Sequence, residues 1–169
     1  MTRGYSAVGL FRPKTKANVG SVLRAASTYQ ASMVAIEGAR GEAIRASTNT
    51  SKAHRIIPTL TPANLLDVRP FDCQIVVVDL LEDAMPLPEF CHPERAMYLF
   101  GPEDGTPGWR HTSKAQHVVY VPGANCMNLA AAVNVVLYDR MVKRNEWQDS
   151  DCRRPYRAMQ IAPSEGEIE

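Results

Sequence analysis

Three short segments carry the side chains of this sequence that could take part in chemistry. They are KTKANVGSVLR (14–24), FGPEDGTPGW (100–109) and VPGANCMN (121–128). The guanidinium of Arg24 could bind a phosphate or stabilise an oxyanion, because it carries a permanent charge and a planar fork of donors. Asn18, Asn128 and Glu103 supply amides and a carboxylate, which could orient a polar substrate by hydrogen bonds. The thiol of Cys126 is not expected to act as a thiolate, since no His or Lys lies near it in the sequence.

Each segment also has a simple structural explanation. Helical spacing puts the apolar residues Val19, Val22, Leu23 and Ala26 on one face of a helix. Arg24 then points away from that face, as an ordinary solvated arginine would. Residues 101–105 (GPEDG) are turn formers, and Asn125 or Asn128 could cap a helix by accepting from free backbone N–H groups. Taken singly, none of the three segments identifies a site.

Strands and helices alternate along the chain. The apolar pattern predicts strands over 7–11, 33–38, 56–60, 74–80, 96–101 and 117–122. It predicts helices over 18–30, 61–68 and 125–141, and a short helix within 107–115. Thr61 is the expected cap of the helix at 61–68, with Pro62 in its first turn. This alternation indicates an α/β fold, with a mostly parallel sheet and helices on both faces.

The three polar segments follow the strands predicted at 7–11, 96–101 and 117–122. In open parallel sheets, ligands bind beyond the carboxyl ends of the strands. The strand at 74–80 reads as a continuous apolar run, which is typical of a strand buried on both faces. We therefore expect the three segments to meet at one edge of the sheet.

The bulk composition limits the classes of protein. A length of 169 residues suggests one domain, which we assign to residues 1–146, followed by a polar tail at 147–169. No apolar run is long enough to span a membrane and no signal peptide opens the sequence, so a cytoplasmic protein is expected. The cysteines Cys73, Cys91, Cys126 and Cys152 are far apart, which argues against zinc and against a disulfide framework.

The net charge of +1 hides an uneven distribution of charge. Residues 1–58 contain nine Lys or Arg against two acidic residues, and residues 59–110 contain three basic residues against nine acidic ones. A basic block can be the binding surface for a phosphate backbone. The alternative is a solvated surface whose charge is balanced in three dimensions by the acidic segment.

Taken together and in this order, the three segments resemble the motifs of the SPOUT superfamily of RNA methyltransferases, in its TrmH/SpoU class. The first motif is NVGSVLR at 18–24, the second is FGPEDG at 100–105, and the third is VPGANCMNLAAAVNVVLYDRM at 121–141. The sequence looks most similar to the single-domain TrmL type. The resemblance covers about residues 5–145.

This resemblance implies a fold and an activity. It implies that the C-terminal third of the α/β domain threads into a deep trefoil knot, although knots are otherwise essentially absent from proteins. It also implies a homodimer that binds S-adenosylmethionine without a metal. The reaction implied is methylation of a ribose 2′-hydroxyl in RNA, with tRNA and its anticodon loop favoured as the substrate.

Roles for particular residues follow from the same resemblance. It implies catalytic roles for Arg24, Asn18, Asn128 and Glu103. It implies cofactor contacts from Val78, Leu80, Gly101, Val121, Cys126 and Met127, with Gly101 and Val121 giving close approach of the main chain. An arginine is so rarely deprotonated that a role in binding phosphate and stabilising the oxyanion is easier to defend for Arg24 than a role as base.

The sequence departs from the family pattern at three places. Cys126 stands where the family has serine, Gln30 stands where it has a glycine after the first helix, and the loop from Pro122 to Cys126 is shorter. Three alternatives therefore stay open. They are an rRNA 2′-O-methyltransferase, a knotted RNA-binding protein without catalysis, and a flavodoxin-like nucleotide-binding module.

Overall fold

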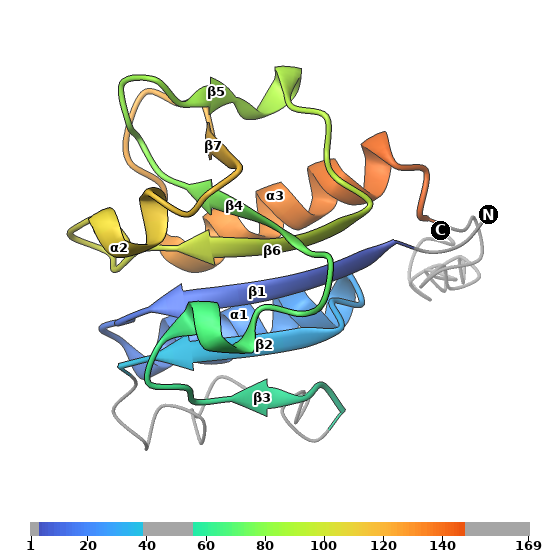
Figure 1. Ribbon diagram of the computed structural model, residues 1–169. Coiled ribbons are helices and arrows are strands. Elements are labelled where there is room, and N and C mark those ends of the chain that lie inside the picture. Colours follow the sequence, from blue (N-terminus) through green and yellow to red (C-terminus); the bar gives the residue numbers. More distant parts are fainter. Residues whose placement is uncertain (1–3, 39–55, 148–169) are drawn as a thin grey trace, which may run out of the picture.

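The computed structural model describes residues 4–38 and 56–147, which form a parallel sheet with helices packed against it (Figure 1). The strands are β1 (Tyr5–Phe11), β2 (Met33–Glu37), β3 (Thr59–Leu60), β4 (Gln74–Val78), β5 (Met85–Pro86), β6 (Arg95–Phe100) and β7 (His117–Tyr120). Their order across the sheet is β3-β2-β1-β6-β4-β7-β5, and every neighbouring pair is parallel. The predicted mostly parallel sheet is confirmed, and only the two-residue β5 was not predicted.

The two long helices, α1 (Lys16–Thr28) and α3 (Leu129–Lys143), lie on the same face of the sheet and pack against each other. In α1 the buried side is the stripe that the sequence predicts. In α3 the stripe is buried at Leu129, Val133, Val136 and Leu137. These side chains meet one face of β1, β4 and β6 in the larger of the two hydrophobic clusters.

The opposite face of the sheet is covered differently. Its smaller cluster contains Leu65, from the short 3-10 helix η3 (Leu65–Val68). The other short helices are η4 (Leu87–Glu89) and α2 (Trp109–Thr112). Helices on both faces were expected, but in the described residues no long helix covers this second face. Pro70 follows η3 by two residues, and a proline there is poorly compatible with extending the helix toward its C-terminus.

Three helix starts differ from the predicted ones, and capping explains each. Thr15 caps α1 by accepting from the N–H of Asn18, so the helix begins two residues before the predicted start. Asn64, not Thr61, caps η3, and the predicted helix at 61–68 is reduced to its second half. Asn128 caps α3, so residues 125–128 form a loop where a helix was predicted.

The end of α1 keeps the backbone shape that a glycine would adopt. Gln30 has a φ of +54° in the left-handed region, directly after the last turn of the helix. Such a conformation is unfavourable for a residue with a Cβ. The glutamine that stands where the family has a glycine therefore keeps the left-handed turn at this position. The boundary between the domain and the tail at 146/147 stays a prediction, because residues 148–169 lie outside the described part of the chain.

Candidate functional site

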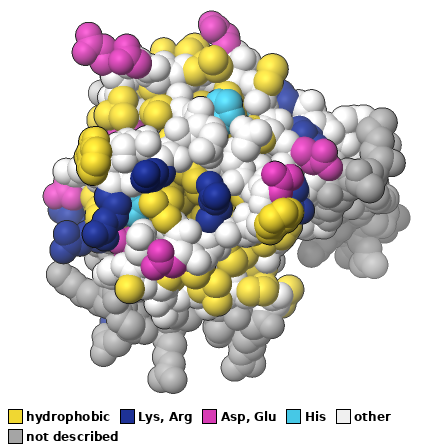
Figure 2. All heavy atoms as spheres, in the orientation of Figure 1, with side chains coloured by type: hydrophobic (Ala, Val, Ile, Leu, Met, Phe, Trp, Pro, Cys, Tyr) yellow, Lys and Arg dark blue, Asp and Glu magenta, His cyan; other side chains and the backbone are white. Residues whose placement is uncertain are grey.

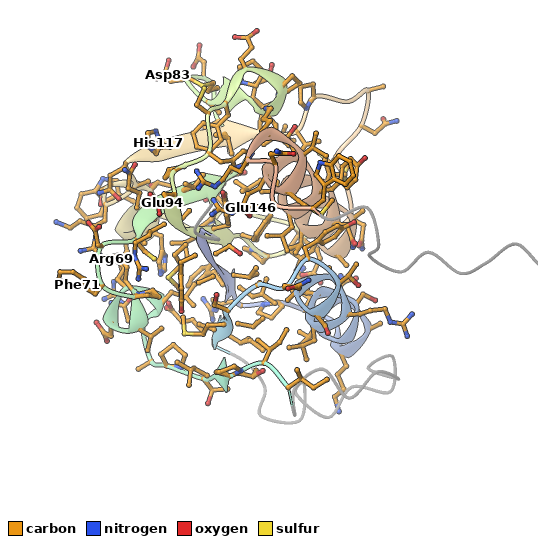
Figure 3. All side chains as sticks on the ribbon, turned by 90° about the vertical axis from the view of Figure 1, so that its right-hand side faces the viewer. Arg69, Phe71, Asp83, Glu94, His117 and Glu146 are labelled. Carbon is orange, nitrogen blue, oxygen red and sulfur yellow. The ribbon has the colours of Figure 1, made fainter. Side chains whose placement is uncertain are left out.

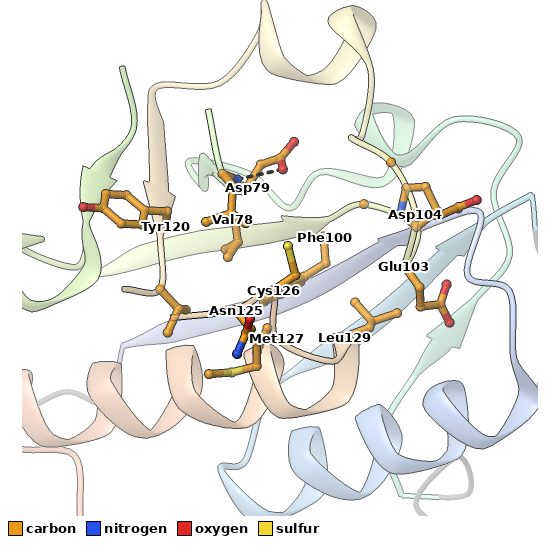
Figure 4. Close-up of a pocket in the computed structure, with 16 residues that line it drawn as sticks. Val78, Asp79, Phe100, Glu103, Asp104, Tyr120, Asn125, Cys126, Met127 and Leu129 are labelled. Carbon is orange, nitrogen blue, oxygen red and sulfur yellow. Dashed lines mark hydrogen bonds between the residues drawn. The ribbon is translucent and has the colours of Figure 1, made fainter. Parts of the chain in front are cut away.

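A cavity of about 280 Å³ opens at the carboxyl edge of the sheet, where β4, β6 and β7 end (Figure 4). The loop that leads into α3 closes it from the other side. All the residues predicted to contact a cofactor line this cavity, namely Val78, Leu80, Gly101, Val121, Cys126 and Met127. The fold therefore brings together residues that are up to 49 positions apart in the sequence, since 127 − 78 = 49.

The wall of this cavity is mainly apolar. Val78 and Phe100 come from the ends of β4 and β6, and Leu129 comes from the first turn of α3. The sulfur of Cys126 points toward the strand ends, while Cys126 itself is exposed (Figure 4). An apolar slot with an open side suits a flat organic ligand with a polar end.

Asp79 adds a carboxylate to this wall, and sequence reasoning did not find it. Its Oδ1 accepts a hydrogen bond of 2.8 Å from the N–H of Leu80, but its buried Oδ2 has no hydrogen-bond partner in the described residues. Burial raises the pKa of Asp79, against the lowering effect of the Leu80 hydrogen bond. A carboxylate directly after the buried residues 75–78 was the signal available in the sequence. An unpartnered buried oxygen is costly, so it indicates a polar or cationic ligand group at this point.

Gly101 has a structural role in the cavity wall, besides the cofactor contact that stays a prediction. A Cβ at this position would lie 2.9 Å from the carbonyl oxygen of Gly105 and 2.9 Å from the nitrogen of Pro107. The missing side chain therefore lets the loop at 101–107 fold back on itself. It shapes the cavity by fixing this loop.

A chain of hydrogen bonds links three of the four predicted catalytic residues. Asn18 donates from Nδ2 to Oε1 of Glu103 at 2.6 Å, and Asn128 donates from Nδ2 to Oδ1 of Asn18 at 3.0 Å. The Oδ1 of Asn128 in turn accepts from the N–H groups of Ala130 and Ala131. The chain fixes both amide orientations and ties the start of α1 to the start of α3.

Glu103 is the charged end of this chain and also lines the cavity. Its other oxygen, Oε2, accepts from the N–H of Lys14 at 2.9 Å. Burial alone would raise the pKa of Glu103, but the hydrogen bonds from Lys14 and Asn18 outweigh it and the pKa is lowered. Lys14 also forms an ion pair with Asp104. The loop at 103–104 therefore carries carboxylates that stay ionised and hold the segment before α1.

Arg24 does not belong to this group. It is exposed on α1, and it neither lines the cavity nor takes part in the hydrogen-bond chain from Glu103 to Asn128. Its predicted orientation, away from the buried stripe of α1, is correct. Its catalytic role stays a prediction. Among the described residues, no cluster of His, Cys, Asp and Glu side chains is arranged to hold a metal ion.

Comparison with known families agrees with this arrangement. A sequence profile described as the SpoU rRNA Methylase family matches residues 6–138. The chain belongs to the SpoU rRNA methylase family. The resemblance to the TrmH/SpoU class of the SPOUT superfamily is thereby confirmed. A search of curated proteins returned no significant match.

Solved structures with the SpoU fold superpose closely on this chain. An AdoMet-bound rRNA methyltransferase from Sinorhizobium meliloti is 19% identical, with a TM-score of 0.74 over 87% of this chain and 59% of its own. The SpoU methyltransferase AviRb from Streptomyces viridochromogenes is 18% identical, with a TM-score of 0.73 over 86% of this chain and 62% of its own.

A third structure is matched over its whole length. It was described in work on the 2-OH methylation of C/U34 on tRNA, and it is 18% identical, with a TM-score of 0.73 over 86% of this chain and 100% of its own. By contrast, the chain spans only about three fifths of the first two structures.

No helix in residues 4–38 or 56–147 is long and apolar enough to cross a membrane.

Proposed function

We propose that this protein is an S-adenosylmethionine-dependent RNA 2′-O-ribose methyltransferase that acts on tRNA. One observation carries the proposal. The cavity is lined by all the predicted cofactor residues and by Glu103, to which Asn18 and, through it, Asn128 are hydrogen-bonded. Membership of the SpoU family supports the same reaction class.

The residues of the cavity fit such a cofactor. Val78, Phe100 and Leu129 offer apolar surface to an adenine ring. The unpartnered buried Oδ2 of Asp79 suits a positively charged group, and S-adenosylmethionine carries both a sulfonium and an ammonium. When bound, the cofactor supplies an electrophilic methyl group. Met127 and Val121 complete the proposed contacts.

The protein's own part in the reaction is to position the ribose and to stabilise charge on its oxygen. We assign orientation of the ribose to Asn18 and Asn128, whose amides are already fixed by the chain to Glu103. We assign binding of the neighbouring phosphate and stabilisation of the developing alkoxide to Arg24. The hydroxyl proton leaves to solvent or to a substrate phosphate oxygen, since the guanidinium remains charged throughout.

Arg24 lies outside the cavity of its own chain, so the reaction needs a second element to bring it there. We infer that a homodimer supplies it, with α1 of one copy facing the cavity of the other. The exposed apolar side chains Tyr138 and Val142 on α3, which are 54% and 46% exposed, support an interface on this side of the molecule.

The order of strands supports a knotted C-terminal third. β7 lies between β4 and β5, so the connection from β4 to β5 spans the strand that follows β6. The N–H of Asp79 in that connection donates to the carbonyl of Val119 in β7 at 2.9 Å. We propose that the chain threads through this connection before it returns as α3.

Two observations bear on the RNA. The structure described for methylation of tRNA is matched over its whole length, whereas the rRNA methyltransferase is matched over 59% of its length. This favours tRNA, with the anticodon loop as the first position to examine and the cytoplasm as the place of action. An rRNA substrate is the second candidate, since the family is described as one of rRNA methylases.

The test is methyl transfer in vitro. Purified protein is incubated with S-adenosylmethionine and either unfractionated tRNA or rRNA, and ribose methylation is mapped by mass spectrometry of nuclease digests. We expect one 2′-O-methylated position in tRNA and none in rRNA. Methylation of rRNA alone would support the second candidate, and cofactor binding without transfer to either RNA would support a non-catalytic RNA-binding protein.

A further inference from the structure

A second cavity, of about 420 Å³, lies at the same edge of the sheet. The segment from β6 to α2 contributes to both cavities, with residues 100–105 in the first and residues 107–111 in the second. The rest of the second cavity comes mainly from the ends of β1 and β2. It therefore adjoins the proposed reaction site without being part of it.

Trp109 stands at the mouth of this cavity and is 82% exposed. Its backbone is nevertheless fixed, because its carbonyl accepts from the N–H of Ser113 at 2.9 Å. The short helix α2 is anchored by His111, which is 1% exposed. The ring of His111 contacts the carbonyl of Pro107 at 2.7 Å and Oε2 of Glu37 at 3.0 Å. An indole held outward on an anchored turn offers a flat apolar face to a ligand.

Two arginines, Arg12 and Arg110, line the same cavity and are exposed. Neither guanidinium forms an ion pair with another described residue. The lining carboxylate, Glu37, is 7% exposed, contacts Nε2 of His111 and accepts from the N–H of Leu65. The acid is therefore directed into the protein, and the rim is cationic. Figure 2 shows Lys and Arg side chains gathered at this edge of the molecule.

The backbone of Arg12 adopts an unusual, left-handed conformation beside the second cavity. Arg12 has a φ of +48°, and Gly38 opposite it has a φ of +66°. A Cβ at Gly38 would lie 2.9 Å from Cγ of Arg12. The guanidinium carbon lies 6.0 Å from the centre of the Phe11 ring. A left-handed conformation beside a cavity is compatible with a functional role for the side chain that it holds there.

We propose that this cavity binds an unpaired nucleotide of the RNA substrate, with its base stacked on Trp109 and its phosphates held by Arg12 and Arg110. The inference rests on the proposed function and narrows its substrate class to RNA with unstacked bases, such as a loop. Aromatic faces and arginines are the groups that recognise bases splayed out of single strands. A base within a duplex cannot reach an indole in this way, because its faces are already stacked.

The first experiment uses the fluorescence of Trp109 itself. The chain contains two tryptophans, so a Trp147→Phe variant leaves Trp109 as the only one. This protein is titrated with a stem-loop RNA, with an unpaired 12-nucleotide RNA, and with a blunt duplex. We expect quenching by the first two and none by the duplex. Equal quenching by the duplex, or no quenching by RNA that binds, would overturn the proposal.

The second experiment measures RNA affinity by filter binding at several salt concentrations. Trp109→Ala should weaken binding of the stem-loop about tenfold or more, as expected for loss of one base stack. Trp109→Phe should keep most of the affinity because it keeps an aromatic face. Arg12→Gln with Arg110→Gln should reduce the slope of log affinity against log salt by about one to two.

Matched controls are Arg69 and Phe71, which lie on the side of the sheet that carries η3 and do not line the cavity (Figure 3). Phe71 is 92% exposed, so Phe71→Ala removes an exposed ring, and Arg69→Gln removes an exposed charge outside the cavity. Both variants should bind RNA as the wild type does. An equal loss of affinity in Phe71→Ala and Trp109→Ala would show that the effect is unspecific, and so overturn the proposal.

Further readouts separate this inference from the proposed function. Calorimetry with S-adenosylmethionine should give the same affinity in Trp109→Ala as in the wild type. Wild-type RNA binding and methylation in Trp109→Ala would overturn the nucleotide site and leave the methyltransferase standing. Absence of cofactor binding and methyl transfer in the wild type would overturn both. A change of oligomeric state in Trp109→Ala, measured by sedimentation, would assign the cavity to a protein interface instead.

Discussion

Two hydrogen-bonded polar networks lie at opposite edges of the same sheet, and they differ in what their side chains bind. At the carboxyl edge, Glu103, Asn18 and Asn128 bind one another beside an open cavity. At the amino edge, Arg140, Tyr98 and His92 are buried, with exposures of 2%, 0% and 7%. One network faces solvent and a ligand cavity, and the other is sealed.

The side chains of the buried network bind the protein's own backbone and one another. Arg140 donates to the carbonyl oxygens of Pro93 at 2.6 Å and Glu94 at 2.7 Å, and to the hydroxyl of Tyr98 at 3.1 Å. His92 bridges Tyr98 and Asp139 at 2.7 and 2.8 Å. Burial raises the pKa of Tyr98 to about 12, although the charge of Arg140 opposes this. These groups join α3 to the starts of β1 and β6, near Glu94 and Glu146 in Figure 3.

A buried charge and a functional charge have different roles in this protein. Arg140 donates to the carbonyls of Pro93 and Glu94 and to the hydroxyl of Tyr98 from a buried position, so its value is structural. Arg24 lies on the exposed side of α1 and contributes little to the core. We therefore expect replacement of Arg140 to lower the stability of the fold and replacement of Arg24 to lower the methylation rate.

Replacing Arg140 should give the largest effect, on stability. Arg140→Met fills much of the space but removes the donors to the carbonyls of Pro93 and Glu94 and to the hydroxyl of Tyr98, so we expect a loss of about 3 kcal/mol or more in the free energy of unfolding. Urea denaturation followed by circular dichroism measures it. Arg144→Met is the control, since its ion pair with Glu146 is partly exposed and should matter by less than about 1 kcal/mol. A similar loss in both variants would remove the distinction between the networks.

Replacing Arg24 should give a large effect on the reaction alone. Arg24→Ala should lower the single-turnover rate of tRNA methylation about 100-fold or more, the scale of one lost oxyanion donor. Its melting temperature should be close to that of the wild type, because the residue is exposed. Arg24→Lys should restore little, since an ammonium lacks the planar fork. Wild-type rates in Arg24→Ala would exclude the catalytic role.

Replacing Asn128 can separate its role as the cap of α3 from its proposed role in orienting the ribose. Asn128→Asp keeps an oxygen for the N–H groups of Ala130 and Ala131, and its charge suits a helix N-terminus. It cannot donate to Asn18, so we expect the methylation rate to fall about tenfold, the equivalent of one lost hydrogen bond of about 1.4 kcal/mol. The helix cap should be kept in Asn128→Asp, whereas Asn128→Ala should lose about 1 kcal/mol of stability with the cap. An active Asn128→Asp enzyme would mean that the Asn128–Asn18 bond is purely structural.

Mild acid should affect the buried network first. Burial lowers the pKa of His92 below its ordinary value near 6.5, although the hydrogen bond to Asp139 works in the other direction. The unfolded chain then binds more protons than the folded one as the pH falls through that value, so stability declines below it. Glu103, whose pKa is lowered, contributes stability that is lost only below the ordinary glutamate range. Unfolding free energies at pH 7.5 and 5.5 should differ less in His92→Gln than in the wild type.

The smallest expected effect concerns the turn after α1. Gln30→Gly relieves a left-handed conformation and should stabilise the protein by roughly 0.5–1 kcal/mol. Thermal melts compare it with the wild type. Methylation should be unaffected, because the turn at the end of α1 is far from its start at Asn18. A destabilised variant would mean that the glutamine side chain supports the turn.

Much of the fold and of the cavity wall could be predicted from the sequence. The strands, the buried stripes of α1 and α3, and the six residues of the cavity wall follow from periodicity and from the motif resemblance. The helix starts could not be fixed in this way, since Thr15, Asn64 and Asn128 compete with other capping residues nearby. Which residue caps depends on where the loop lies, and the loop position is set by the sheet.

The sequence by itself determined which residue types gather at the carboxyl edge, because strand–helix alternation and parallel pairing leave those loops no other edge. Only the tertiary structure decided that Glu103, Asn18 and Asn128 form one chain of hydrogen bonds. Only the tertiary structure placed Asp79 in the cavity wall with a buried oxygen unpaired, and set Trp109 beside Arg12. These contacts join segments up to about a hundred residues apart, and no local pattern encodes such distances.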